Sequence, residues 1–155
     1  MDLSDLLTPD SVLPALKAQS KKQVIQDLSE KASRLTGIPE REIFDTILQR
    51  ERLGSTGVGH GVAIPHGKLA AVTKLTGVFA RLARPVEFDS LDEQPVDLVF
   101  LLLAPESAGA DHLKALARIA RVLRDPNFAQ KLRSTADAKA LYALLIKPTP
   151  ETNAA

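Results

Sequence analysis

A chain of 155 residues, 45% hydrophobic and 25% charged, is expected to fold as one soluble globular domain with a hydrophobic core. Because it contains no cysteine, disulfides, thiolate metal sites and cysteine nucleophiles are excluded. The net charge of +1 gives no reason to expect nucleic acid, and without a signal-peptide pattern or an apolar run long enough for membrane insertion, we expect a cytoplasmic protein.

Two helices are predicted in the first third of the chain. Ser20 is a suitable N-cap for the first, with a glutamine three residues later as in a capping box, and Gly37 is placed to end it. Pro39 suits the first position of the second helix, which should end near Arg52. Residues 1–19 predict only one helical turn and a short edge strand. The inward helix faces should carry Val24, Ile25, Leu28, Ala32, Leu35, Ile43, Phe44, Ile47 and Leu48.

The middle of the chain has the pattern of β-strands. Residues 54–61 are expected to form a glycine-rich loop that leads into a buried strand at 62–64. A second strand fits 77–83, and a short edge strand fits 86–88 after a turn. The segment 96–104 is the strongest prediction of a β-strand, and it is apolar on both faces. Helices should therefore cover both sides of the sheet.

The last third predicts three more helices. The first should span about 111–124, the second should run from Pro126 to about Arg133, and the third fits 136–146. The inward face of the first of these should carry Leu113, Leu116, Ile119, Ala120 and Leu123.

The order of these elements predicts the fold class. Helices stand before and after the strands, some strands have hairpin-like spacing, and no repeat or linker is present. We therefore expect an α/β protein, a single-domain α/β/α sandwich with a mixed central β-sheet. The domain would span 1–155, with its core at about 3–147 and a disordered tail at 148–155.

The stretch Arg50–Lys68, R-E-R-L-G-S-T-G-V-G-H-G-V-A-I-P-H-G-K, holds five of the eight glycines and two of the three histidines. Backbone N–H groups exposed in such loops can bind anions. A dinucleotide fingerprint fails because a valine replaces its third glycine and the order of strand and helix is reversed. A P-loop fails because leucine follows Gly67-Lys68. A tight connection with positive φ at several glycines is the alternative.

His66 is the candidate nucleophile in this stretch. Pro65 fixes the backbone before it and Gly67 follows, so backbone geometry should hold the histidine at a strand end. Neutral imidazole is a good nucleophile at physiological pH, and it could accept and pass on a phosphoryl group. A structural histidine is the alternative. The donors available nearby for phosphoryl oxygens are Arg50, Arg52, Ser55, Thr56 and the loop amides.

The other two histidines leave alternatives open. His112 lies at a predicted helix N-terminus, where it could donate a hydrogen bond to a phosphoryl oxygen or simply be a surface residue. His60, between two glycines, is most simply a loop residue. Three histidines also allow a zinc-dependent hydrolase, although their spacing does not support one. No Gly-x-Ser-x-Gly motif of serine hydrolases is present.

The stretch Arg50–Lys68 resembles the active-site signature of the fructose–mannitol type of enzyme IIA in the bacterial phosphotransferase system, and within it the nitrogen-related branch. The similarity continues at Gly77-Val78-Phe79, along 94–100 and at the helix start Asp111-His112-Leu113. It therefore covers nearly the whole chain. The glycine loop together with Ile64-Pro65-His66 is the specific part of the signal.

The resemblance implies roles for particular residues. It places the phosphorylated nucleophile at His66, a second active-site histidine at His112 and the motif arginine at Arg50. His60 departs from the family pattern, in which asparagine or another polar residue is expected. The loop residues that would bind the phosphoryl group are Ser55, Thr56 and Gly57.

The resemblance also implies partners and a function. The phosphoryl donor would be an HPr-like histidine phosphocarrier, and neither metal nor cofactor is expected because that donor is already a phosphoramidate. In the nitrogen-related branch, the phosphorylation state regulates protein targets such as potassium-transport or sensor-kinase proteins. The alternative is a sugar-specific component that passes the phosphoryl group to a IIB component.

Overall fold

The apolar run at 96–104 forms the central strand of the protein, and the computed structural model describes residues 2–147 around it. This strand pairs antiparallel with β5 and parallel with both β3 and β4. The sheet order is β1-β5-β6-β3-β2, with β4 also paired to β6, so the predicted mixed sheet is confirmed. The strands are β1 (Val12–Leu16), β2 (Gly57–Gly59), β3 (Val62–Ala63), β4 (His66–Leu69), β5 (Thr76–Val86) and β6 (Val96–Pro105).

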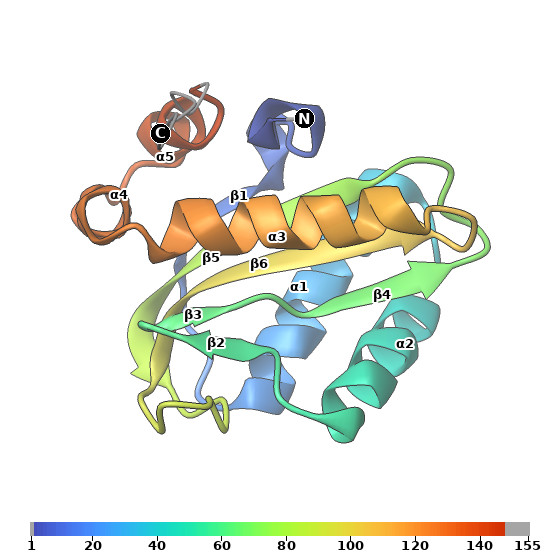
Figure 1. Ribbon diagram of the computed structural model, residues 1–155, viewed down its shortest axis with the longest axis horizontal. Coiled ribbons are helices and arrows are strands. Elements are labelled where there is room, and N and C mark those ends of the chain that lie inside the picture. Colours follow the sequence, from blue (N-terminus) through green and yellow to red (C-terminus); the bar gives the residue numbers. More distant parts are fainter. Residues whose placement is uncertain (1, 148–155) are drawn as a thin grey trace.

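Helices cover both faces of this sheet, which confirms the α/β/α sandwich (Figure 1). Helices α1 and α2 pack on one face, and α3, α4 and α5 lie on the other. Their bounds are α1 (Lys21–Thr36), α2 (Glu40–Leu53), α3 (Ala110–Arg124), α4 (Pro126–Arg133) and α5 (Ala138–Leu145), preceded by the 3₁₀ turns η1 (Leu3–Asp5) and η2 (Pro9–Ser11).

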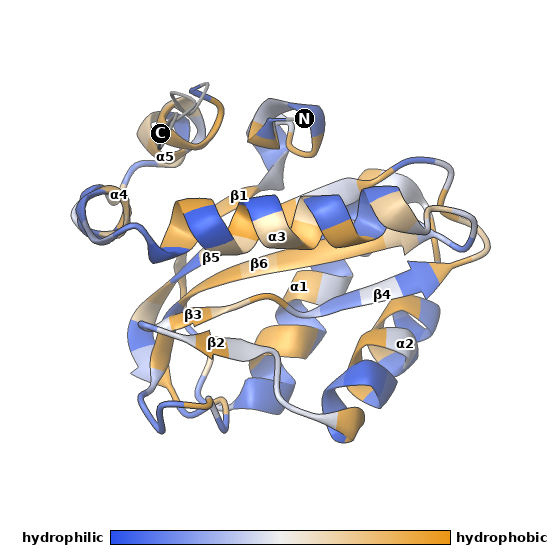
Figure 2. Ribbon diagram, in the orientation of Figure 1, coloured by the Kyte–Doolittle hydropathy of each residue, from blue (hydrophilic) through white to orange (hydrophobic). Residues whose placement is uncertain are grey.

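Side chains of β6 alternate between two hydrophobic cores, because successive residues of a strand face opposite sides of the sheet. Val99 and Leu101 belong to the core with α1 and α2, whereas Leu98 and Phe100 belong to the core with α3, α4 and α5. Figure 2 shows β6 hydrophobic along most of its length and hydrophilic residues on the outward side of α3. Burial on both faces explains why the segment has no polar alternation in sequence.

The predicted ends of α1 are confirmed. The Ser20 hydroxyl accepts a hydrogen bond from the Gln23 N–H at 3.1 Å, and Gly37 ends the helix with a φ of 79°. The capping box is only half formed, because the Gln23 side chain accepts from the Gln19 N–H instead of the Ser20 N–H. Pro39 lies just before the first residue of α2 rather than at it.

Three predictions for the strands need correction. The edge strand at 86–88 is wrong: β5 runs on to Val86, which pairs with Val96 after a register shift that accommodates Pro85. Part of the predicted glycine loop forms β2, because it pairs back onto β3. Strand β4 was not predicted, since His66–Leu69 has no apolar run. It forms because β6 extends beyond β3 and leaves backbone groups to be paired.

The C-terminal helices agree with the sequence prediction to within a few residues. Helix α5 begins at Ala138 because the Asp137 side chain accepts a hydrogen bond from the Ala140 N–H as its N-cap. The predicted tail at 148–155 lies outside the described residues. Within residues 2–147, no helix is long and apolar enough to cross a membrane.

Gly67 controls how closely α2 approaches β4. A Cβ atom at this position would lie 2.8 Å from Cγ2 of Thr46 and 3.2 Å from Cδ1 of Ile47, two residues of α2. Arg50 follows them one turn later on the same helix. The missing side chain therefore lets the helix that carries Arg50 pack directly against the strand that begins with His66.

Replacement of Gly67 by alanine should lower the free energy of unfolding by about 1–3 kcal/mol, because the added methyl group must push α2 outward. Urea unfolding measures this difference. Gly54→Ala is the matched control: its Cβ would meet no atom within 4 Å and its φ of 161° suits any residue, so the change should stay within about 0.5 kcal/mol. Equal effects of the two substitutions would contradict the close packing at Gly67.

Candidate active site

His66 lies where the chain passes from β3 to β4, and its ring is fixed by a local hydrogen bond. Its Nδ1 atom is 2.8 Å from the carbonyl oxygen of Ile64, so Nδ1 carries the proton and donates it. The Pro65 carbonyl accepts from the Leu102 N–H at 2.9 Å, which anchors the segment on β6. In this tautomer, Nε2 of the half-buried His66 keeps its lone pair.

His112 belongs to the first turn of α3, and its ring meets the ring of His66. The two ring centroids are 5.5 Å apart, with an angle of 72° between the planes. His112 is only 6% exposed, and its Nε2 has no hydrogen-bond partner among residues 2–147. Of the two alternatives for His112, the surface residue is therefore wrong. Leu113, which was expected to face inward, is 69% exposed instead.

The two histidines and Arg50 line the same cavity, which has a volume of about 500 Å³. Three elements meet there: α2 from one side of the sheet, β4 in the sheet and α3 from the other side. Among the predicted site residues, the structure thus brings together His66, His112 and Arg50. The cavity is lined by Thr46, Gln49, Arg50, Leu53, His66, Gly67, Lys68 and His112.

Burial and nearby positive charge keep both imidazoles neutral. Burial lowers the pKa of His66 and the charge of Arg50 lowers it further, while the Ile64 carbonyl and the Glu51 carboxylate act in the opposite direction. Burial also lowers the pKa of His112, helped by His66 when that ring is protonated and by the charge of Lys68. Neutral imidazole is the nucleophilic form, so this environment favours nucleophilic chemistry at His66 at neutral pH.

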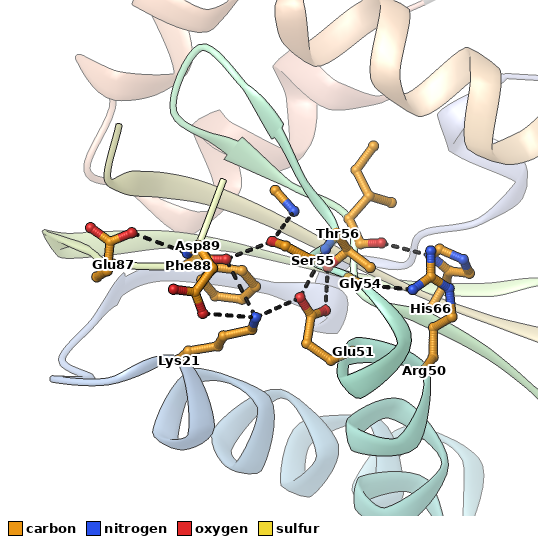
Figure 3. Close-up of polar contacts among 12 residues, drawn as sticks. Lys21, Arg50, Glu51, Gly54, Ser55, Thr56, His66, Glu87, Phe88 and Asp89 are labelled. Atoms are coloured by element: carbon orange, nitrogen blue, oxygen red, sulfur yellow. Dashed lines mark hydrogen bonds and ion pairs between the residues drawn. The ribbon is translucent and has the colours of Figure 1, made fainter. Parts of the chain in front are cut away.

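Arg50 takes part in both the helix end and the cavity. Its Nη1 donates to the Gly54 carbonyl at 2.8 Å, which satisfies one of the free carbonyls beyond the last turn of α2 (Figure 3). The planar guanidinium has five N–H donors, so this bond leaves others for an anion. Lys68 adds a second positive charge to the lining of the cavity.

The loop residues Ser55, Thr56 and Gly57 do not line the cavity. The Ser55 hydroxyl donates to the Phe88 carbonyl at 2.6 Å and accepts from the Gly57 N–H at 3.0 Å. Thr56 is buried and donates to Glu51 with both its hydroxyl and its N–H (Figure 3). These contacts fix the loop beside the cavity, and binding of a phosphoryl group by the three residues stays a prediction.

His60 lies at the turn between β2 and β3, with a φ of 59°. Its N–H donates to Oδ2 of Asp92 at 3.0 Å and its carbonyl accepts from Nη2 of Arg133 at 2.8 Å. The prediction of a loop residue is confirmed. Among residues 2–147, no group of three histidine or carboxylate side chains is arranged to hold a metal ion.

The sequence prediction missed two residues near the site. Lys68 follows His66 by two positions in one strand, so period-two alternation places both side chains on one face and could have revealed it. Glu51 is 6% exposed, although it stands between two arginines in the sequence. Nothing in the sequence distinguished it from a surface carboxylate, because its partners Lys21 and Thr56 are brought to it by the fold.

Comparison with known proteins gives one consistent result. Residues 5–147 match the model of the family described as phosphoenolpyruvate-dependent sugar phosphotransferase system, EIIA 2. The chain is 62% identical to a nitrogen regulatory protein of Bradyrhizobium diazoefficiens over 96% of this chain and 97% of the relative. A fructose-specific EIIA component of Haloferax volcanii is 35% identical over 85% and 88% of the two chains.

A solved structure supports the same grouping. The crystal structure of nitrogen regulatory protein IIA-Ntr from Neisseria meningitidis superimposes with a TM-score of 0.87 at 34% identity, covering 92% of this chain and 98% of that one.

The lowered pKa values of His66 and His112 predict how stability depends on pH. Below about pH 6.5, His66 and His112 bind protons in the unfolded chain but stay largely unprotonated in the folded protein. The free energy of unfolding should therefore fall as the pH drops through about 6.5 toward the lowered folded values, and the two groups should contribute nothing well above that pH. Urea unfolding from pH 8 to pH 5 measures the slope.

The double substitution of His66 and His112 by glutamine is the control for this slope. Glutamine does not titrate, so the wild-type protein should lose more stability than the double variant between neutral and mildly acidic pH. Parallel curves for the two proteins would contradict the lowered pKa values.

Proposed function

The chain belongs to the EIIA 2 family of the phosphoenolpyruvate-dependent sugar phosphotransferase system, and on this basis we propose that it accepts a phosphoryl group on Nε2 of His66. The donor would be an HPr-like histidine phosphocarrier, and the reaction would take place in the cytoplasm. The observation that carries the proposal is the Nδ1–H hydrogen bond of His66 to Ile64. It leaves Nε2 as the nitrogen with a free lone pair, in a cavity supplied with positive charge.

The transfer step follows from this tautomer. The Nε2 lone pair attacks the phosphorus of the carrier's phosphohistidine in line, and a new P–N bond forms as the bond to the carrier breaks. The electron pair of the broken bond returns to the carrier's imidazole. Nδ1 of His66 keeps its proton, and the positive charge that develops on the ring is stabilised by the Ile64 carbonyl and by the charge of Glu51.

Three side chains of the cavity are suited to the phosphoryl oxygens. Arg50 and Lys68 supply positive charge, and His112 has a buried Nε2 without a partner among the described residues. Donors that are already in place when charge builds up need no reorganisation, which is the main source of electrostatic catalysis. Catalysis here would consist of positioning and charge stabilisation around a neutral nucleophile.

A regulatory role of the nitrogen-related kind has the strongest support. The 62% identity to a nitrogen regulatory protein extends over nearly the whole of both chains. Phosphorylation would add about −1.5 to −2 charges beside Arg50 and Lys68 and so offset most of their positive charge. Leu53, which lines the cavity and is 84% exposed, offers apolar contact next to this switch. Protein targets, such as potassium-transport or sensor-kinase proteins, would then distinguish the two states.

The alternative is a sugar-specific component that passes its phosphoryl group to a IIB component. It has weaker support, because the fructose-specific relative is 35% identical to this chain, whereas the nitrogen regulatory protein is 62% identical. The two roles differ in the fate of the phosphoryl group. A sugar-specific component would lose it when a IIB component, its membrane transporter and the matching sugar are supplied together.

Intact-mass measurement at alkaline pH tests the proposed nucleophile. After incubation with phosphoenolpyruvate, enzyme I and the HPr-like carrier, the wild-type protein should gain one acid-labile phosphoryl group, and His66→Ala should gain none. His60→Ala is the matched control, since this histidine lies outside the cavity, and it should label like wild type. A labelled His66→Ala protein would refute the assignment.

Substitutions of the cavity donors should slow the transfer without abolishing it. Arg50→Lys loses the planar fork and His112→Ala loses a buried donor, so each should lower the rate of labelling by about ten- to a hundredfold. Rapid-quench kinetics measure these rates. Arg34→Lys, an exposed arginine of α1, serves as the control and should keep the wild-type rate. An unchanged rate for Arg50→Lys would mean that Arg50 only caps the end of α2. An unchanged rate for His112→Ala would mean that His112 only contributes to packing.

A further inference from the structure

Glu51 is a buried carboxylate that enters the transfer step described above only through its charge. Its side chain is 2% exposed, and it lies in the last turn of α2 next to Arg50. A buried charge is costly unless donors surround it. The donors that contact Glu51 must therefore offset the cost of burying its charge.

Three donors from two different segments converge on Glu51. Nζ of Lys21, at the start of α1, lies 2.8 Å from Oε2. The Thr56 N–H donates to Oε2 at 2.8 Å, and the Thr56 hydroxyl donates to Oε1 at 2.5 Å. Figure 3 shows the carboxylate between Lys21 and Thr56. Both oxygens are used, so the position and the orientation of Thr56 are fixed relative to α2.

The contact continues from Thr56 to the nucleophile through the backbone. The Thr56 carbonyl accepts a hydrogen bond from the Ile64 N–H at 3.0 Å. The Ile64 carbonyl in turn accepts from Nδ1 of His66 at 2.8 Å. Only Thr56 and Ile64 therefore separate the carboxylate of Glu51 from the imidazole of His66, and each contact from one residue to the next is a hydrogen bond.

We propose that Glu51 is a positioning residue for His66, acting through Thr56 and Ile64. The carboxylate fixes Thr56, and the Thr56 carbonyl holds Ile64 through its N–H. The Ile64 carbonyl, on the other side of that residue, holds the proton on Nδ1 so that Nε2 presents its lone pair. The inference rests on the proposed function in that Nε2 is taken as the atom that receives the phosphoryl group.

The chemical consequence is specific to the tautomer of His66. A neutral imidazole has one proton, and the nitrogen that carries it is set by the partner of that nitrogen. If the Ile64 carbonyl loses its fixed position, the proton can move to Nε2, and the fraction of molecules with a nucleophilic Nε2 falls. A merely structural carboxylate would alter stability and leave the tautomer unchanged.

The test combines histidine ¹⁵N NMR at pH 8 with the rate of labelling by the HPr-like carrier. Wild type should show one His66 tautomer, with the proton on Nδ1. Glu51→Gln removes the charge and one carboxylate acceptor, and Thr56→Val removes the hydroxyl donor. Both variants should show a mixture of His66 tautomers, and Glu51→Gln should transfer about ten- to a hundredfold more slowly. Thr56→Ser keeps the hydroxyl, so this variant should show the single wild-type tautomer of His66 and the wild-type rate of labelling.

Two controls separate positioning from stability. Asp97→Asn removes a carboxylate that pairs with Arg133 at 2.9 Å on another part of the sheet, and it should leave the His66 tautomer as in wild type even where it lowers stability. His60 is the internal reference, since it is exposed and lies outside the cavity that holds His66. If Glu51→Gln does not fold, Thr56→Val and Thr56→Ser decide the question with the same two measurements.

Folded variants with the wild-type tautomer and the wild-type rate would overturn the inference. The NMR measurement needs no phosphorylation, so it judges the positioning by itself. A wild-type protein that takes no phosphoryl group would refute the proposed function, whatever the His66 tautomer proves to be.

Discussion

The hydrogen bond from Nδ1 of His66 to the Ile64 carbonyl is the constraint on which the proposed chemistry depends. It selects one tautomer, and burial beside Arg50 keeps that tautomer neutral by lowering the pKa of the ring. An imidazole that is neutral, oriented and next to positive charge can attack phosphorus and then retain the phosphoryl group. Each property comes from a different part of the fold.

The fold supplies these properties by bringing three elements to one point. Strand β6 is buried on both faces and holds β3 and β4 in register on either side of the break at Pro65. Gly67 lets α2 approach with Arg50, and α3 places His112 over the ring of His66. The site therefore has contributions from both helical layers and from the sheet, although most of its residues come from a single stretch of the chain.

The sequence predicted the parts of this arrangement that have a local cause. Capping at Ser20, the chain reversal at Gly37 and the apolar central strand follow from neighbouring residues, and the Ile64-Pro65-His66 motif identified the nucleophile candidate. The burial of His112 and Glu51 was missed because it depends on partners distant in sequence. Leu113 was expected inside because a helix pattern alone does not show which residue of the first turn has a neighbour to pack against.

NMR of the phosphorylated protein, labelled with ¹⁵N in histidine, can show whether Nε2 of His66 carries the phosphoryl group. Phosphorus should couple to Nε2 of His66, and the Nδ1 proton should remain visible in its hydrogen bond to Ile64. Coupling of phosphorus to Nδ1, or to either ring nitrogen of His112, would contradict this assignment.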